Sequence, residues 1–313
     1  MSDTPIQQIA KSVGYRVPEL RLTVGLPGSG KTQYALHLLD TSNYVVATNR
    51  WRRVNWDNMR YDRGMHLRSF RREDEDKMQA DSFLLAETYA HMGYDVIVDN
   101  TNLSESTRNK WKGVAQRVGM NYNEVWMEPT LEECIRNDES RKGSRGYVGR
   151  AVIERMALFA GLIKFREGER LVLVDMDGTM ADCTHRRVFI TNGRHEWNKF
   201  ESEEILKDPP RFAIINLVKM LNEQGYIILV VSGRDINRAG HHTVAWLKRY
   251  GIPYRHIFMR QGGDHRQDSI VKKEILDRLP LKQISYVLDD RDQVVKMWRE
   301  NGLTCLQVDD GNF

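Results

Sequence analysis

The chain is poor in cysteine and has no long apolar run. Its 313 residues include only Cys134, Cys183 and Cys305, and no two of them form a Cys-x-x-Cys pair. This spacing supports neither a disulfide framework nor a zinc ribbon, and it is typical of buried or bystander thiols in a reducing compartment. No segment approaches the ~20 apolar residues of a membrane span, and residues 1–20 lack the apolar core of a signal peptide. We therefore expect a soluble cytoplasmic protein with no membrane partner.

Charge of neither sign dominates the composition. The 47 Lys and Arg residues against 43 Asp and Glu leave a net charge of +4, with a pI near 8.8. This balance permits a polyanionic partner without requiring one. Apolar residues make up 41% and charged residues 29% of the chain. A chain of this length and composition is typical of about two ordinary globular domains, and disorder is excluded.

Short apolar runs alternate with amphipathic stretches along most of the chain. A first alternation starts near residue 20 and a second at "RLVLVD", residues 170–175. Apolar strands that alternate with helices predict parallel sheets covered on both faces, so we predict an α/β fold. We predict an extension at 1–20 and two domains at 21–165 and 166–313. Three of the expected helices close on a glycine, at Gly225, Gly251 and Gly302.

The segment "GLPGSGKT" fits the pattern G-x-x-x-x-G-K-[ST]. It follows the expected strand "RLTV" and precedes the expected helix "TQYALHLL". In this context backbone N–H groups surround the phosphates of a nucleoside triphosphate, Lys31 reaches the β- and γ-phosphates and the Thr32 hydroxyl binds Mg²⁺. The residues expected to bind ATP here are Gly25, Gly28, Ser29, Gly30, Lys31 and Thr32.

An acidic residue follows the next expected strand, in "VNWDNMRYDR". The carboxylate of Asp57 can accept the proton of an acceptor hydroxyl as it attacks the γ-phosphate. Arg60, one helical turn later, can hold an anionic group of the acceptor. Judged alone, the stretch fits a solvated charged helix face equally well.

Basic residues surround this acid. Residues 49–72 hold eight arginines against two acids, interleaved with Trp51, Trp56 and Tyr61, which is typical of a single-stranded nucleic-acid groove. A further basic run, "RNDESRKGSRG", predicts a mobile lid that places an arginine on the transferring phosphate. The lid carries Arg136, Arg141, Lys142 and Arg145; Arg141 is the predicted contact, and Arg136 and Lys142 remain alternatives.

The second half contains "LVLVDMDGT", an apolar strand followed by two acids and a turn through Gly178 and Thr179. A carboxylate at this position beside Mg²⁺ can attack phosphorus, which makes Asp175 the predicted nucleophile. Asp177 can protonate the leaving oxygen and then activate water. An acid pair before a turn is common, so this motif alone proves little.

Three further segments follow in order. "ILVVSGR" ends a strand with Ser232 and Arg234, which can donate hydrogen bonds to phosphate oxygens. "DSIVKKEI" places Lys272 one helical turn after an acid, and "SYVLDDR" ends a strand with two acids that suit Mg²⁺. The predicted ligands of Mg²⁺ are Thr32, Asp175, Asp177, Asp289 and Asp290.

Together these motifs resemble the haloacid-dehalogenase superfamily, and from residue 22 to the end the chain is similar to the bacteriophage polynucleotide kinase 3′-phosphatases. "GLPGSGKT", "DNTNL", "DMDGT", "VVSGR" and "VLDDRDQVVKMW" carry the resemblance. The resemblance implies a P-loop 5′-hydroxyl kinase at 21–165 and a Rossmann-like haloacid-dehalogenase-type 3′-phosphatase at 166–313. It also implies that the protein is a homo-oligomer, and that it works in the host cytoplasm if a phage encodes it. It implies catalytic roles for Lys31, Asp57, Arg141, Asp175, Asp177, Arg234 and Lys272. The substrate-binding residues it implies are Arg60, Thr179, Arg186, Ser232, Arg234 and Asp268.

A chain with both activities would heal broken nucleic-acid ends. It would transfer the γ-phosphate of ATP to 5′-hydroxyl ends of RNA or of single-stranded or nicked DNA, and remove a 3′-phosphate or 2′,3′-cyclic phosphate through an aspartyl-phosphate. A nucleic-acid ligase would then seal the ends. The alternatives are a small-molecule kinase fused to a metabolite phosphatase, and an ATP-driven switch protein with a relic phosphatase fold.

Overall fold

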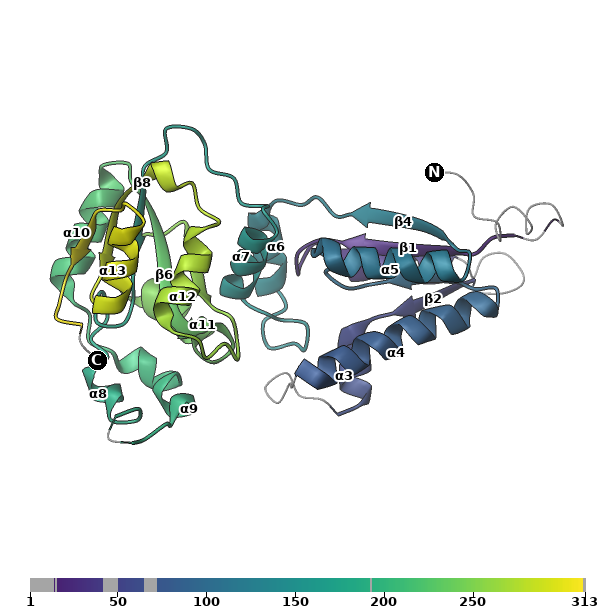
Figure 1. Ribbon diagram of the computed structural model, residues 1–313, viewed down its shortest axis with the longest axis horizontal. Coiled ribbons are helices and arrows are strands. Elements are labelled where there is room, and N and C mark those ends of the chain that lie inside the picture. Colours follow the sequence, from purple (N-terminus) through teal and green to yellow (C-terminus); the bar gives the residue numbers. More distant parts are fainter. Residues whose placement is uncertain (1–13, 15, 42–49, 65–71, 192, 312–313) are drawn as a thin grey trace. The chain divides into compact units, whose positions relative to one another are not determined.

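The computed structural model describes residues 14, 16–41, 50–64, 72–191 and 193–311. Two compact units, Met1–Ser140 and Arg141–Phe313, each contain one sheet whose strands are all parallel (Figure 1). The predicted α/β class with two parallel sheets is therefore confirmed. Most of the predicted N-terminal extension, and residues 65–71 of the basic stretch, lie outside the described residues.

The sheet of the first unit has the strand order β2-β3-β1-β4. Its strands are β1 (Glu19–Val24), β2 (Trp51–Val54), β3 (Asp95–Val98) and β4 (Asn121–Trp126). Its helices are α2 (Lys31–Thr41), α3 (Trp56–Asp62), α4 (Arg72–His91), α5 (Glu105–Arg117) and α6 (Leu131–Glu139).

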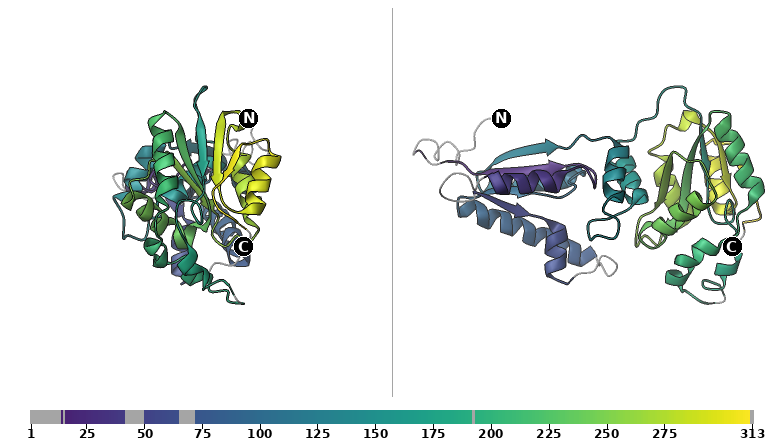
Figure 2. Two further views of the ribbon diagram at one scale, coloured as in Figure 1. Left: turned by 90° about the vertical axis from the view of Figure 1, so that its left-hand side faces the viewer. Right: turned by 180° about the vertical axis from the view of Figure 1, so that it is seen from behind.

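The two central strands of this sheet are covered on both faces. Trp111 of α5 and Ala86 of α4 pack with Leu22 and Val98 on one face. On the other face, Ala35 of α2 packs on Ile97 and Trp51. Figure 1 shows α5 in front of the sheet, and Figure 2 shows the purple α2 from behind. Burial on both faces explains the apolar run Val96–Val98 in β3, whereas β1 alternates apolar with polar residues.

The sheet of the second unit has the order β7-β6-β5-β8-β9. Its strands are β5 (Leu171–Val174), β6 (Ile227–Asp235), β7 (His256–Arg260), β8 (Ile284–Asp289) and β9 (Cys305–Gln307). Its helices are α7 (Arg150–Phe159), α8 (Thr184–Arg187), α9 (Trp197–Phe200), η3 (Glu203–Lys207), α10 (Phe212–Glu223), α11 (Ile236–Arg249), α12 (Asp268–Leu276), η4 (Leu281–Gln283) and α13 (Asp292–Glu300).

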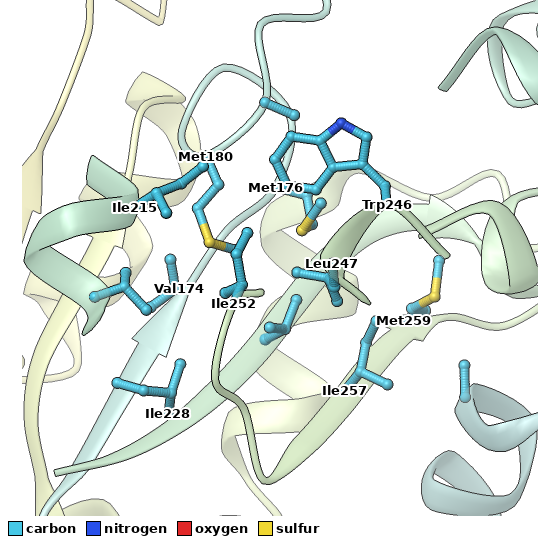
Figure 3. Packing of buried hydrophobic residues seen from close by; sticks show 14 of the residues in the cluster. Val174, Met176, Met180, Ile215, Ile228, Trp246, Leu247, Ile252, Ile257 and Met259 are labelled. Atoms are coloured by element: carbon cyan, nitrogen blue, oxygen red, sulfur yellow. The ribbon is translucent and has the colours of Figure 1, made fainter. Parts of the chain in front are cut away.

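Two apolar clusters fill the two faces of this second sheet. On one face α10 and α11 contribute Ile215, Trp246 and Leu247 (Figure 3). On the other face α12 and α13 contribute residues such as Ile275 and Trp298. Both tryptophans are essentially fully buried.

Three helices end where the sequence predicts. Gly225, Gly251 and Gly302 follow α10, α11 and α13, and their φ values are +81°, +57° and +78°. Only glycine adopts this left-handed conformation at little cost. The glycines therefore turn the chain from each helix toward the next strand.

Helix α7 covers the outer edge of β7 with polar side chains. The buried carboxylate of Glu154 accepts a hydrogen bond from the N–H of Ile257 (2.7 Å) and pairs with Arg150 (2.9 Å). Arg150 and Arg155 donate to the carbonyl groups of Arg255 and Met259, both at 2.9 Å. These bonds satisfy backbone groups that an exposed edge strand would offer to another chain. Because α7 packs on this sheet, it belongs to the second compact unit.

Among the described residues, no helix combines the length and apolar character that crossing a bilayer requires. All three cysteines are unpaired and buried, as predicted. Burial raises the pKa of the Cys183 and Cys305 thiols to about 12 each, so neither is a reactive thiolate near neutral pH.

Replacing Glu154 tests the polar cover of the β7 edge. We expect Glu154→Ala to lower the free energy of unfolding by about 1–3 kcal/mol, because the N–H of Ile257 loses its acceptor in a buried position. Urea unfolding followed by circular dichroism measures this change. The matched control is Glu300→Ala, since the side chain of Glu300 is 63% exposed and its ion pair is long. Equal stabilities of the two variants would contradict the assigned role of Glu154.

Candidate active sites

The first candidate site is the loop between β1 and α2. Gly28 and Gly30 have φ values of +79° and +90°, so the loop needs glycine at both positions. A Cβ on Gly28 would also collide with the carbonyl group of Cys134 in α6. The amide nitrogen of Asn137 donates to the carbonyl of Gly28 (2.9 Å), so α6 packs directly on the loop. The predicted strand–loop–helix context is present.

The charged end of Lys31 lies inside the curve of this loop. Its Nζ donates to the carbonyl of Leu26 (2.6 Å) and to the hydroxyl of Ser29 (3.3 Å), and the side chain is largely buried. Thr32 is exposed at the start of α2. A helix N-terminus with a buried ammonium group beside it is an arrangement that binds phosphate. The geometry therefore fits the predicted nucleotide loop.

Asp57 and Arg60 lie together in the first turns of α3. The guanidinium of Arg60 contacts the Asp57 carboxylate at 2.6 Å and also pairs with Glu75 of α4. The Asp57 side chain is 73% exposed and follows the end of β2, at the same sheet edge as the glycine loop. An exposed carboxylate at this edge can reach an incoming hydroxyl.

The segment between β3 and α5 links the glycine loop to α3, a connection that the sequence motifs do not reveal. Thr101 accepts a hydrogen bond from the N–H of Gly25 (3.0 Å), and Asn100 accepts one from the N–H of Trp56 (2.9 Å). Asn102, at a φ of +47°, donates to the carbonyl of Thr23 (2.8 Å). One of these bonds uses the backbone carbonyl of Thr101, and the other two use the side chains of Asn100 and Asn102. Together they connect the nucleotide loop with the acidic helix.

Three arginines of the basic stretch contact other residues of the first unit, although their sequence pattern predicts contacts with nucleic acid. Arg53 pairs with the buried Asp99, and Arg50 pairs with the buried Asp95. Arg52 stacks over the ring of Tyr94, at 3.7 Å from its centroid. These contacts orient the basic side chains along the sheet. A role in binding nucleic acid stays a prediction.

The lid arginines fall in different parts of the chain. Arg136 is an exposed residue in the last turn of α6, the helix that packs on the glycine loop. Arg141, Lys142 and Arg145 lie in the turns that follow it, at the start of the second unit. Which of them contacts the transferring phosphate stays a prediction.

The second candidate site is an acidic cluster at the carboxyl ends of β5 and β8. Carboxylate oxygens of Asp175, Asp289 and Asp290 lie within 4.8 Å of one another, and all three residues are buried. Gly178, with a φ of +81°, lies against Asp290, where a Cβ would collide with the carboxylate. The turn predicted from "DMDGT" therefore brings the two strand ends together.

Lys272 of α12 lies between two of these acids. Its Nζ donates to Asp175 (2.7 Å) and to Asp289 (2.8 Å) in a fully buried position. Burial and the neighbouring carboxylates raise the pKa of Asp175, and they raise that of Asp290 to about 6. Burial opposes the charge of Lys272, but Asp175 and Asp289 outweigh it and raise the pKa of the ammonium group. The ammonium group of Lys272 thus counters part of the rise in the pKa of Asp175, the predicted nucleophile.

Asp177 lies apart from this cluster, although the sequence analysis places it among the metal ligands. Its carboxylate accepts hydrogen bonds from Arg186 (2.7 Å) and from Arg234 (2.9 and 2.6 Å). Burial alone would raise the pKa of Asp177, but the two guanidinium groups outweigh burial and hold the pKa well below its usual value. The two guanidinium groups orient the carboxylate of Asp177, and no described contact gives its side chain a metal site. A proton-transfer role for Asp177 stays a prediction.

The other predicted residues of this site are brought to the same sheet edge. Ser232 and Thr179 are buried, and the Thr179 hydroxyl contacts Asp290 at 3.3 Å. Asp268 lies against Gly233 and pairs with Arg291 (2.6 Å) and Arg260. Burial opposes the ionisation of Asp268, but Lys272 and the two arginines outweigh it and lower its pKa. An anionic Asp268 is suited to orienting the neighbouring arginines, because its negative charge attracts guanidinium groups and repels a phosphate.

Two residues of this site escape sequence reasoning. Asp208 accepts hydrogen bonds from Arg186 (2.6 Å) and Arg234 (3.0 Å), so it holds both arginines in place. The indole N–H of Trp298 donates to Asp289 (3.0 Å), although its spacing predicts only core packing. Trp298 is the last residue of "VLDDRDQVVKMW", but that motif does not show that its indole contacts Asp289. Asp208 follows η3 and lies in none of the motifs.

Comparison with known proteins agrees with these two sites. Residues 169–313 match the model of the polynucleotide kinase PNKP phosphatase domain, and residues 20–161 match that of the AAA domain. A candidate bifunctional polynucleotide kinase/RNA ligase of Autographa californica nuclear polyhedrosis virus is 26% identical over 301 residues. The alignment covers 90% of this chain and 41% of the viral protein, so the chain spans about two fifths of that relative.

Similar chains also occur among solved structures. A chain of the Pnkp1/Rnl/Hen1 RNA repair complex is 25% identical and aligns over 97% of this chain and 100% of its own length, with a TM-score of 0.41. A haloacid dehalogenase-like hydrolase of Streptococcus pneumoniae is 14% identical over 44% of this chain and 84% of its own, with a TM-score of 0.34. The two family models cover separate halves of the chain: the second half is similar to the phosphatase domain of polynucleotide kinase PNKP, and the first half is similar to the AAA domain.

Proposed function

We propose that this chain heals broken nucleic-acid ends with two activities. The first half transfers the γ-phosphate of ATP to a 5′-hydroxyl, and the second half removes a 3′-phosphate. The observation that carries this proposal is the union, in one chain, of a complete phosphate loop and a PNKP-type phosphatase domain with a buried nucleophile site. A 5′-phosphate and a 3′-hydroxyl are the ends that a ligase joins, so a nucleic-acid ligase is the proposed functional partner.

In the kinase half, the glycine loop and Lys31 hold the phosphates of ATP. Asp57 accepts the proton of the 5′-hydroxyl, whose oxygen bonds to the γ-phosphorus while the bond to the β–γ bridging oxygen breaks and ADP leaves. Arg60, already in contact with Asp57, binds an anionic group of the acceptor strand. Arg141, with Arg136 or Lys142 as alternatives, stabilises the transferring phosphate.

In the phosphatase half, a carboxylate oxygen of Asp175 attacks the phosphorus of the 3′-phosphate. The bond to the 3′-oxygen breaks, and Asp177 supplies the proton that the leaving oxygen needs. Water then attacks the aspartyl-phosphate and gives its proton to Asp177, which releases inorganic phosphate and restores Asp175. Ser232 and Arg234 bind phosphate oxygens.

The two arginines on Asp177 suit the second of these steps, because they favour the carboxylate that accepts a proton from water. The first step needs the protonated form. A dianionic phosphate competes with Asp177 for the N–H groups of Arg234. Each hydrogen bond that Arg234 transfers from Asp177 to the phosphate removes stabilisation of the Asp177 carboxylate. The pKa of Asp177 then rises, which favours the protonated form that the first step needs.

The acidic cluster fits a divalent cation. One oxygen of Asp290 is buried without a hydrogen-bond partner among the described residues, and Asp175 and Asp289 lie beside it. Clustered carboxylate oxygens are the ligands that Mg²⁺ prefers. Mg²⁺ bound there would lower the repulsion between the nucleophile and the phosphate. Thr32 is the proposed Mg²⁺ ligand in the kinase half.

A small-molecule kinase fused to a metabolite phosphatase is the competing function. The wild-type protein with radiolabelled ATP and a 5′-hydroxyl, 3′-phosphate oligonucleotide separates the two functions, because only end healing gives both label transfer and phosphate release. Absence of both reactions on RNA and on DNA would overturn the proposal.

Substitutions in the first half should act on the kinase alone. We expect Lys31→Ala to abolish label transfer and Asp57→Asn to reduce it about 10²–10⁴-fold, because the hydroxyl loses its base. Phosphate release from 3′ ends should remain at the wild-type rate, which also serves as the control for folding. A near-normal kinase rate in Asp57→Asn would remove Asp57 from the acceptor site.

Substitutions in the second half should act on the phosphatase alone. Asp175→Asn keeps the shape of the side chain but removes the attacking charge, so we expect no phospho-enzyme and no phosphate release. Asp177→Asn leaves the nucleophile intact, and turnover should fall about 10²–10⁴-fold because the leaving oxygen receives no proton. Acid-quenched labelling of the protein detects the phospho-enzyme. Label on Asp175→Asn would contradict the assignment of the nucleophile.

Trp298 should tune the affinity of the acidic cluster for Mg²⁺. Trp298→Phe keeps an aromatic ring in the core but removes the N–H that orients Asp289. We expect about 10–100-fold weaker Mg²⁺ binding, measured by calorimetric titration as well as by the Mg²⁺ dependence of phosphate release.

Trp246→Phe is the matched control, because this buried indole donates to the carbonyl of Asp208 on the other face of the sheet. Its Mg²⁺ affinity should equal that of the wild type. An unchanged Mg²⁺ affinity in Trp298→Phe would reduce Trp298 to a packing role.

A further inference from the structure

An exposed tryptophan lies beside the phosphatase site, on the short helix α9 of the insert between β5 and β6. The side chain of Trp197 packs edge-to-face on Phe200, with 5.7 Å between ring centroids and 85° between planes. Phe200 is buried, but Trp197 remains 43% exposed. Exposure alone does not mark a binding site, so the case for Trp197 depends on its surroundings.

Helix α9 is fixed to the groups that surround Asp177. The guanidinium of Arg186 lies over the Phe200 ring, 4.4 Å from its centroid, and donates to the Phe200 carbonyl. The same guanidinium contacts Asp177 at 2.7 Å. The indole of Trp197 is therefore linked to the proton-transfer group through two intervening side chains, Phe200 and Arg186.

The other end of α9 is held by the segment that follows Arg234. Glu201, the residue after α9, is buried and accepts a hydrogen bond from the N–H of Asp235 (2.7 Å). Its second oxygen pairs with Arg238 at 2.7 Å. Contacts at both Arg186 and Asp235 set the place of α9 relative to the phosphate-binding residues, so Trp197 has a defined position at the edge of the site.

Basic residues outnumber acidic ones in the part of the insert that runs from α8 to the end of α9. From Thr184 to Phe200 the sequence contains four arginine and lysine residues and one carboxylate. Arg194 and Lys199, near Trp197 in the sequence, are exposed, and the carboxylate of Glu196 is paired with Lys199. Basic side chains around an exposed aromatic ring are typical of single-stranded nucleic-acid sites.

We propose that Trp197 stacks on the base of the nucleotide that carries the 3′-phosphate. The inference rests on the proposed phosphatase function and adds a base-recognition site to it. A phosphate held beside Asp175 places its own nucleoside at the mouth of the site, where the indole face is available. Stacking accepts every base, because each has a π-face, so the site selects a base-bearing end without selecting its sequence.

Three substrates of the phosphatase reaction test this role. They are an oligonucleotide with a normal 3′-terminal nucleotide, the same oligonucleotide with an abasic 3′-terminal residue, and p-nitrophenyl phosphate. We expect Trp197→Ala to lower kcat/KM about 5- to 150-fold on the first, mainly through KM. The abasic end and the small phosphate should react as with the wild type, and Trp197→Phe should restore most of the activity on the normal end.

Trp126→Ala is the matched control, because Trp126 of β4 is exposed to a similar degree, 46%, but belongs to the first unit. Its phosphatase activity on all three substrates should equal that of the wild type. Equal kcat/KM of Trp197→Ala and wild type on the normal end would overturn the stacking role. An equal loss on all three substrates would also overturn it, because Trp197 would then only support the fold. A wild-type protein inactive on every 3′-phosphorylated end would instead overturn the phosphatase function itself.

Discussion

Three carboxylates that repel one another are held together in the second unit by one buried ammonium group. Asp175, Asp289 and Asp290 come from the ends of two neighbouring parallel strands, and Lys272 bonds to the first two. Burial and the neighbouring carboxylates raise the pKa of Asp175 and of Asp290, and the ammonium group counters part of this rise, which favours the charged form of both acids. Each surrounding feature supports this balance: the Gly178 turn gives Asp290 room, and Trp298 turns Asp289 toward the lysine.

Both candidate sites use the same property of parallel sheets. Side chains that follow parallel strands gather at one edge, and loops there present N–H groups and helix N-termini. In the first unit this edge carries the glycine loop after β1 and the acidic helix after β2. In the second it carries the acidic cluster after β5 and β8. The first edge is suited to binding phosphates through backbone donors, and the second to attacking phosphorus with a carboxylate.

Sequence patterns predicted the elements and strand ends well, because strand burial, helix-ending glycines and the phosphate loop each depend on local backbone conformation. Gly225, Gly251 and Gly302 have the expected positive φ. The predicted roles of the site residues stay predictions. What the patterns could not give were contacts between distant segments. Asp208 is 22 residues from Arg186, and Trp298 is nine residues from Asp289. Trp298 ends the motif "VLDDRDQVVKMW", but no local pattern reveals either contact. The spacing of Asp175 and Asp177 did not predict that Asp175 would contact Lys272 while Asp177 would contact two arginines.

The arginine pair on Asp177 connects the chemistry to the insert. Arg186 belongs to α8 of the insert and Arg234 to the end of β6, and both also bond to Asp208. Four charges that are nearly balanced, two guanidinium groups and two carboxylates, can remain buried because each hydrogen bond is charge-assisted. Removing either arginine would leave a buried carboxylate short of a partner and remove one of the contacts that hold the insert, beside those of Glu201. The guanidinium of Arg186 contacts both Asp177 and Phe200 of the insert. The positions of the Asp177 carboxylate and of the insert are therefore coupled, because a shift of one alters the contact with the other.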